Sequence, residues 1–225
     1  MSDSPPTLAT DRLVLRAWEA ADADDVLALY SRPETVRWSG GPGTELATRA
    51  DALERLARWE VRAARGGPRG IWLVTDPAAP TDPAAPTDPA GRSDPAVRAG
   101  GTDSSGAGEE SRPVVVGDVL LVDLPASSPD GSRPPSGDLE IGWHLHPDRW
   151  GRGYATEAAR AVLAHAWSHG VERVLAVTHP DNVASQAVAR RIGMRHAGRT
   201  TAYYDTECEL FVVEAPAARR SVPSV

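Results

Sequence analysis

The segment Gly137–Arg160 constrains the fold of this chain more than any other. It reads GDLEIGWHLHPDRWGRGYATEAAR, which predicts a strand, a turn and then an alanine-rich helix. A turn of this kind points several backbone N–H groups at one place, and the N-terminus of a helix favours an anion there. Gly151 and Gly153 allow close approach, and Arg152 adds a positive charge. We therefore expect a polyphosphate at this turn, although the two glycines could also serve only to shape it.

Composition and charge exclude several classes of protein. The 225 residues include 24 arginines, no lysine and 31 acidic residues, for a formal net charge of −7, which argues against a nucleic-acid partner. The longest apolar run, Val114–Leu124, is too short to span a bilayer, and the N-terminus lacks the apolar core of a signal peptide. The single cysteine, Cys208, argues against a disulfide and a thiolate metal cluster. We expect a cytoplasmic monomer or homodimer without a membrane partner.

Strand and helix patterns alternate along the chain. Strands are predicted at 13–18, 70–75, 114–124, 139–146, 171–178, 196–202 and 209–213. Helices are predicted after the acidic cluster at 22–25 and over 44–65, 154–169 and 182–192. Such an order favours an α/β or α+β arrangement in which helices cover a sheet.

Two stretches interrupt this pattern. Repeats of TDPAAP lead into residues 77–112, which hold six prolines and almost no aliphatic side chain larger than alanine. A segment of this composition cannot offset its ordering entropy by burying apolar surface, so we predict a disordered insertion there and a second one at 125–137. The rest forms one predicted domain at 11–215, between a flexible N-terminus at 1–10 and a flexible tail at 216–225.

Four segments together resemble the GCN5-related N-acetyltransferases, and within them the RimJ/RimL-type ribosomal-protein N-acetyltransferases. They are TDRLVLRAW, EIGWHLHPDRWGRGYATEA, THPDNVASQAVARRIGM and AGRTTAYYDTECELFVV. The resemblance implies an α+β fold whose central sheet is mixed and mostly antiparallel, flanked by helices, with one splayed strand pair for the cofactor. The family pattern of Gln or Arg, two residues, Gly, one residue, then Gly or Ala falls on 150–155, where Trp150 replaces the Gln or Arg. Because main-chain N–H groups do most of the binding in that pattern, this departure matters little.

The resemblance also implies a set of binding residues for acetyl-CoA, and no metal. The pantetheine would lie along the 139–146 strand, at His144, Leu145 and His146. The pyrophosphate would lie on Trp150, Gly151, Arg152, Gly153, Tyr154 and Ala155, with the Thr156 hydroxyl in support. Asn182 would lie near the pantetheine and Ser185 near the thioester sulfur, although this spacing also suits a plain helix cap.

The implied reaction is direct attack of a primary amine, either a protein N-terminal α-amine or a small-molecule amine, on the thioester in a ternary complex. A thiol has a pKa of about 8.5, so a weak donor such as the hydroxyl of Ser185 or Tyr204 suffices for the leaving group, with Tyr203 as the alternative tyrosine. Glu140 could accept the amine proton through water, or it could be a carboxylate satisfied on a sheet face. Several members of this branch carry an acidic residue where this chain reads RTTAYY.

That missing acidic residue leaves a second function open, a catalytically weak acyl-CoA-binding or regulatory module. Three tryptophans, Trp18, Trp38 and Trp143, are predicted either to line a substrate groove or to belong to the core. Two histidine pairs, 144/146 and 165/169, are not expected to bind metal because no third ligand accompanies them.

Overall fold

A computed structural model describes residues 4–38, 44–63, 66–79 and 113–216. The predicted insertion at 77–112 and the predicted tail at 216–225 fall almost entirely outside these ranges. The described strands form one eight-stranded sheet in the order β1-β2-β3-β4-β5-β6-β8-β7. The strands are β1 (Leu8–Ala9), β2 (Val14–Ala17), β3 (Gly70–Asp76), β4 (Val114–Pro125), β5 (Pro135–Leu145), β6 (Arg173–Thr178), β7 (Arg195–Thr200) and β8 (Cys208–Glu214).

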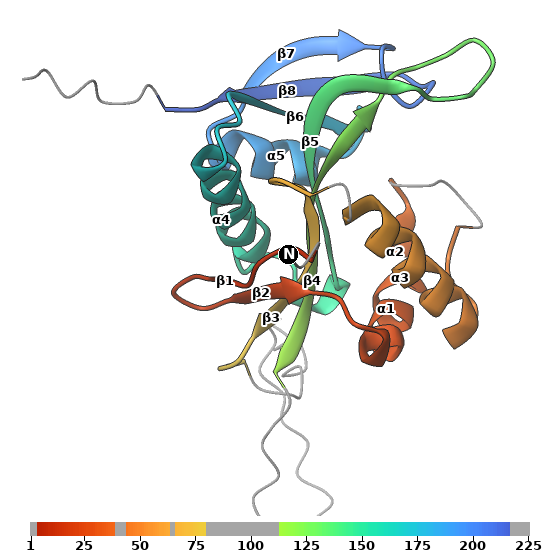
Figure 1. The fold of residues 1–225 in the computed structure, drawn as a ribbon, viewed down its shortest axis with the longest axis vertical. Helices are drawn as coiled ribbons and strands as arrows, with labels where there is room; N and C mark the ends of the chain where they lie inside the picture. Colours follow the sequence, from red (N-terminus) through yellow and green to blue (C-terminus); the bar gives the residue numbers. More distant parts are fainter. Residues whose placement is uncertain (1–3, 39–43, 64–65, 80–112, 217–225) are drawn as a thin grey trace, which may run out of the picture.

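All neighbouring strands are antiparallel except β5 and β6, which are parallel. Helices cover both faces of the sheet (Figure 1). One face carries α4 (Tyr154–Ser168) and α5 (Val183–Arg191), and the other carries α1 (Ala23–Tyr30), α2 (Pro33–Val36) and α3 (Arg49–Ala63). Short 3-10 turns occupy Ala20–Asp22 and Pro147–Arg149. The predicted α+β class with a mixed, mostly antiparallel sheet is confirmed.

The main core lies between the sheet and α4. Alternate side chains of the strands point to this face, as the two-residue period of a strand requires, and small residues on α4 let the helix approach the sheet closely. The buried side chains that meet here include Leu13, Leu15, Trp72, Val74, Val119, Leu121, Ile141, Ala158, Ala159, Val162, Ala166 and Phe211. A second, smaller core forms among α1, α2 and α3 on the opposite face.

Strands β5 and β6 diverge and leave an opening in the middle of the sheet. β5 pairs with β4 along its whole length, yet its only pairing with β6 is Glu140 with Leu175. Beyond that pair, 141–145 on β5 and 176–178 on β6 have no strand between them. This opening is the splayed strand pair that the resemblance implied, and it fixes the position of the site.

The loop between β4 and β5 differs from the predicted disordered segment at 125–137. Pro125 ends β4 and Pro135 begins β5, so the connection is shorter than expected. It is also held in place, because Ala126 N donates to Pro134 O at 2.7 Å and Ser127 N donates to Ala202 O at 2.7 Å. Its order comes from hydrogen bonds to a distant segment rather than from apolar burial, which is why composition predicted disorder.

The N-terminal residues also differ from the predicted flexible segment at 1–10. β1 pairs with β2 through Leu8 and Ala9, and the indole Nε1 of the buried Trp72 donates to Pro6 O at 2.8 Å. Thr10 Oγ1 donates to a carboxylate oxygen of Glu157 at 2.6 Å. The chain from about residue 6 is therefore part of the folded domain.

Candidate active site

One large cleft joins the two faces of the molecule at the splayed strands. Its volume is about 2330 Å³, and it is lined by the start of α4, the start of α5, strands β5 and β6, helices α1–α3 and the β7–β8 loop. Nearly all of the predicted site residues line it, namely Glu140, His144, Leu145, Trp150, Gly151, Gly153, Tyr154, Ala155, Thr156, Asn182, Ser185 and Tyr204.

The glycine turn leaves the N-terminus of α4 open to the cleft. Gly151 and Gly153 have φ values of +75° and +81°, a left-handed conformation that glycine adopts most easily. Gly153 is the N-cap residue, and no side chain caps this helix. The N–H groups of the first turn, which have no partner inside a helix, therefore remain available. An anion of the size of a phosphate fits this cradle.

An arginine that the sequence reasoning missed supports the same turn. Arg12 forms an ion pair with Glu157 at 2.6 Å, and its Nη1 donates to Arg152 O at 3.2 Å. Glu157 is the only acidic residue in the first turn of α4, so Arg12 offsets the one carboxylate that would repel an anion there. Arg12 lies in the segment TDRLVLRAW, but no residue near it in the sequence indicates that its partner is 145 residues away.

Further positive charge lies along this end of the cleft. Its arginines are Arg12, Arg149, Arg160 and Arg191. Arg149 is 6% exposed and its Nη1 has no hydrogen-bond partner within the described residues. The hydroxyl of Thr178, at the end of β6, is also buried without a partner there. Unpaired buried polar groups cost free energy, so the cleft suits a polar, anionic ligand better than an apolar one.

The backbone of β5 refines the predicted pantetheine contacts. His146 N donates to Val116 O at 2.9 Å, so this N–H group is already used within the sheet. Because backbone groups alternate in direction along an antiparallel ladder, those of Leu145 and Trp143 point away from β4 and toward the opening. Leu145 O accepts a hydrogen bond from the indole Nε1 of Trp150 at 2.9 Å. Of the three predicted residues, Leu145 is thus the one whose backbone faces the cofactor opening.

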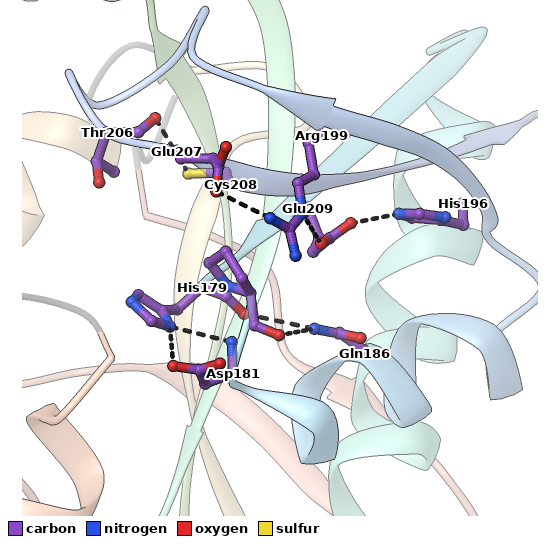
Figure 2. A network of polar contacts seen from close by, with 10 residues as sticks. His179, Asp181, Gln186, His196, Arg199, Thr206, Glu207, Cys208 and Glu209 are labelled. Atoms are coloured by element: carbon purple, nitrogen blue, oxygen red, sulfur yellow. Dashed lines mark hydrogen bonds and ion pairs between the residues drawn. The ribbon is translucent and has the colours of Figure 1, made fainter.

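The start of α5 forms the wall on the β6 side (Figure 2). Asn182 caps the helix, since its Oδ1 accepts from Ser185 N at 3.1 Å, and both residues line the cleft. Gln186 Nε2 donates to Pro180 O at 2.8 Å, and His179 Nδ1 accepts from Asp181 N at 3.1 Å. These bonds fix the loop that presents Asn182 and Ser185. Asn182 can therefore cap the helix and line the cleft at the same time.

Glu140 and Tyr204 meet inside the cleft. The Tyr204 hydroxyl donates a short hydrogen bond to Glu140 Oε2. Burial raises the pKa of Glu140 from 4.5 to about 7, because the charged form loses hydration. Burial and the nearby Glu140 carboxylate raise the pKa of Tyr204 well above 10.0. At neutral pH the pair can therefore both hold and release a proton.

The β4–β5 loop holds Tyr204 in this position. Tyr204 and Asp205 have φ values of +58° and +56°, a conformation uncommon for residues other than glycine. Arg133 Nη2 donates to Tyr204 O at 3.1 Å, and its Nε forms an ion pair with Asp205 at 2.7 Å. Ser128 N donates to Asp205 Oδ1 at 2.8 Å, and Asp205 N donates to Ser127 Oγ at 2.9 Å. The loop expected to be disordered thus positions a candidate catalytic residue.

The structure also separates the alternatives for the aromatic residues. The hydroxyl of Tyr203 donates to Asp138 at 3.1 Å, and Tyr203 lies outside the cleft. Trp38 and Trp143 line the cleft, whereas Trp18 packs against Trp59 in the smaller core with ring centroids 5.7 Å apart. The predicted groove therefore holds two of the three tryptophans.

A buried acid and a histidine form a second polar group in the cleft. Asp118 on β4 is fully buried and lies 2.9 Å from Nδ1 of His144, its partner across the β4–β5 ladder. The Tyr30 hydroxyl donates to the other carboxylate oxygen at 2.5 Å. The sequence reasoning missed this group. Its signal was an aspartate in the middle of the apolar run VVVGDVLLVDL.

Within the described residues, no group of three or more histidine, cysteine or acidic side chains could hold a metal ion. Among the same residues, none of the helices combines the length and the apolar character needed to cross a bilayer.

Comparison with known proteins identifies the family. A family model described as an acetyltransferase (GNAT) domain matches residues 12–195. The chain belongs to the GNAT acetyltransferase family. Its fold is similar to that of Mycobacterium smegmatis RimJ in complex with CoA-disulfide, with a TM-score of 0.65 at 15% identity over 95% of this chain and 89% of that one. RimL, described as a ribosomal L7/L12 α-N-protein acetyltransferase, gives a TM-score of 0.63 at 14% identity over 93% and 98%.

Two curated relatives match this GNAT chain more closely in sequence, but over short segments. The uncharacterized N-acetyltransferase YnaD of Bacillus subtilis is 40% identical over 60 residues, which is 26% of this chain and 35% of that protein. The FsC-acetyl coenzyme A-N(2)-transacetylase of Aspergillus fumigatus is 37% identical over 68 residues, which is 30% of this chain and 29% of that protein. The chain thus spans about a third of the length of the curated relatives it matches. The comparisons thus show the family, and neither the activity nor the acceptor of this chain.

Proposed function

We propose that this chain transfers the acetyl group of acetyl-CoA to a primary amine, by direct attack in a ternary complex. The observation that carries the proposal is one continuous cleft that holds an uncapped helix N-terminus at one end and the Glu140–Tyr204 pair in its middle. The first feature suits a pyrophosphate, and the second suits proton transfer. The proposed catalytic unit is the domain predicted at 11–215, extended to include β1.

The binding residues follow from the cleft. The N–H groups that follow Gly151 and Gly153 would hold the pyrophosphate, and Arg12 and Arg160 would add positive charge. The opening between β5 and β6 would take the pantetheine, with the backbone of Leu145 facing it. When bound, acetyl-CoA supplies the thioester whose carbonyl carbon is attacked.

The attacking amine would release one proton to a base in the cleft, and the departing sulfur would take up another from the chain's own groups. Tyr204 would donate its proton to the departing sulfur, and Glu140 would return one to it, because its pKa of about 7 leaves about half of the carboxyl groups protonated at neutral pH. Ser185 is a second hydroxyl in the cleft wall. A thiol with a pKa of about 8.5 needs only a weak donor, so either hydroxyl suffices.

The acceptor is proposed as a protein N-terminal α-amine or a small-molecule amine. An α-amino group has a pKa of about 8, against about 10.4 for a lysine side chain, so a usable fraction is neutral at physiological pH. RimL is described as an α-N-protein acetyltransferase, and its fold likeness supports the first class. The cleft side that faces α1–α3 offers Trp38, Trp59 and Trp143 for an acceptor side chain.

The alternative is a catalytically weak acyl-CoA-binding or regulatory module, which would keep the cleft without efficient transfer. A thiol-release assay with acetyl-CoA against peptides, polyamines and aminoglycosides separates the two. Transfer to any amine well above the rate of acetyl-CoA hydrolysis supports the enzyme. A thermal shift with CoA but no release with any amine supports the module, and no shift at all contradicts both.

A further inference from the structure

The group formed by Asp118, His144 and Tyr30 has the geometry of a proton acceptor. His144 Nδ1 lies 2.9 Å from Asp118 Oδ1 and 3.0 Å from the Tyr30 hydroxyl oxygen. The Tyr30 hydroxyl donates to Asp118 Oδ2 at 2.5 Å. An ionised carboxylate only accepts hydrogen bonds, so Asp118 is satisfied on one oxygen by Tyr30 and on the other by the Nδ1–H of His144.

This arrangement fixes the state of the imidazole. A neutral histidine with its proton on Nδ1 carries a lone pair on Nε2. Within the described part of the chain, no hydrogen bond to Nε2 of His144 occurs, and this atom is not among the buried unpartnered ones. The buried Asp118 carboxylate, 2.9 Å from Nδ1, holds the ring in place, which is the orienting role of the aspartate in a serine-hydrolase triad.

His144 is also placed where an acceptor amine can reach it. Its side chain is 18% exposed and lines the cleft. Glu140, Gly142 and His144 share one face of β5, because side chains alternate along a strand. A Cβ atom at Gly142 would lie 3.1 Å from the Leu120 side chain, so glycine leaves room for that side chain between the two polar residues.

We propose that His144 is the general base that accepts the proton of the attacking amine, and that Asp118 and Tyr30 are positioning residues for it. This inference rests on the proposed acetyl transfer. As the nitrogen lone pair bonds to the thioester carbonyl carbon, one N–H proton passes to Nε2 of His144. The C–S bond then breaks with its electron pair on sulfur, and the sulfur takes a proton from Tyr204.

The neighbouring groups are consistent with this division of roles. Glu140, on the same face of β5, is engaged with Tyr204 and serves the leaving-group side. The charged and titratable groups around His144 are Asp118 on β4, Tyr30 on α1, Glu140 on β5 and, from α3, Arg55, whose guanidinium stacks on the Tyr30 ring at 4.1 Å. The contacts of Nδ1 with Asp118 and Tyr30 orient the ring and leave Nε2 without a hydrogen-bond partner within the described residues.

The test compares His144→Gln, Asp118→Asn and Tyr30→Phe with the unaltered protein. For His144→Gln we expect kcat to fall by roughly 10² to 10⁴, with an unchanged thermal shift by CoA. The loss should shrink as pH rises through the pKa of the amine, because solvent then supplies the deprotonated nucleophile. His196→Gln is the control, since His196 also pairs with a carboxylate, Glu209 at 2.6 Å, but lies outside the cleft (Figure 2).

A second readout does not depend on turnover. Long-range ¹H–¹⁵N spectra should show the Nδ1–H tautomer of His144 at neutral pH, and Asp118→Asn should shift it toward Nε2–H, because an amide can donate to Nδ1. An Nε2–H tautomer in the unaltered protein overturns the proposal. So does full kcat in His144→Gln while the unaltered protein acetylates amines. If the unaltered protein binds CoA but acetylates no amine of the panel, the proposed function falls and this inference falls with it.

Discussion

Tyr204 donates its hydroxyl hydrogen to Glu140 Oε2, although 64 residues separate the two in the chain. The contact joins the β7–β8 loop to the strand that borders the cofactor opening. Glu140 is buried and Tyr204 is half-buried, and both line the cleft. Two measurable consequences follow from this pair, one for stability and one for catalysis.

Replacing Glu140 with glutamine should change how stability depends on pH. The folded-state pKa of about 7 exceeds the unfolded value of 4.5, so the folded protein holds this proton more tightly than the unfolded chain. The stabilisation is complete below pH 4.5 and is lost as pH rises through 7. Glu140→Gln lacks this loss, and its free energy of unfolding relative to the unaltered protein should rise by about 3 kcal/mol from pH 4 to pH 8. Denaturant unfolding at several pH values measures it.

Glu209→Gln provides a control of opposite sign. His196 and Arg199 lower the pKa of Glu209, so its contribution to stability is present at high pH and lost as pH falls through the folded-state value. The glutamine variant should therefore lose stability mainly above that value. A pH-independent difference between Glu140→Gln and the unaltered protein would contradict the raised pKa.

Replacing Tyr204 with phenylalanine should slow the reaction and leave cofactor binding intact. If Tyr204 protonates the departing sulfur, its contribution grows only as the C–S bond breaks, and kcat should fall by roughly 10² to 10⁴. Tyr203→Phe is the matched control, because Tyr203 is the adjacent tyrosine and bonds Asp138 outside the cleft. Equal kcat values for the two variants would leave Ser185 or solvent as the donor, which Ser185→Ala then distinguishes.

The Arg133→Met variant tests whether the β4–β5 loop positions Tyr204. The Arg133–Asp205 ion pair is exposed, and its removal should change stability by less than about 1 kcal/mol. Tyr204 would lose one of the contacts that hold its left-handed backbone, so kcat should fall while the KM for acetyl-CoA stays near its original value. Arg49→Met removes another exposed ion pair, with Asp24, and is the control. A kcat equal to that of this control would show that the loop is not needed for positioning.

Local pattern and family resemblance predicted different parts of this molecule. The turn at Gly151 and Gly153 could be recognised from the residues alone, because a glycine turn before a helix is a local feature. The splay of β5 and β6 could not, since divergence depends on how two strands far apart in sequence pair. It was inferred from the resemblance. Helix α2 was not predicted, because its four residues give too short a pattern.

The rest of the site depends on contacts between distant segments. The β4–β5 loop is rich in Ser, Pro and Gly, and its partners are Ala202 and Asp205, more than 70 residues away. Asp118 and His144 become neighbours only through the β4–β5 register. A one-residue shift of that register would turn one of them to the opposite face. Reasoning from composition and spacing has no access to such a register.

Replacing Gly153 with glutamate should weaken CoA binding. A side chain at the N-cap of α4 would lie beside the open N–H groups, and a negative charge there would repel the pyrophosphate. Any larger residue at φ +81° also strains the backbone, so the matched control is Gly153→Gln, which has the same size and strain without the charge.

Two charges about 4 Å apart interact by about 1 kcal/mol in water and by more in a shielded site. The Kd for CoA should therefore be at least roughly fivefold weaker in the glutamate variant than in the glutamine variant. Thermal shift with CoA measures this, since a ligand at about 100 times its Kd stabilises the fold by about 2.7 kcal/mol. Equal shifts in both variants and in the unaltered protein would place the pyrophosphate elsewhere in the cleft, whereas an equal loss in both would assign the effect to the backbone rather than to charge.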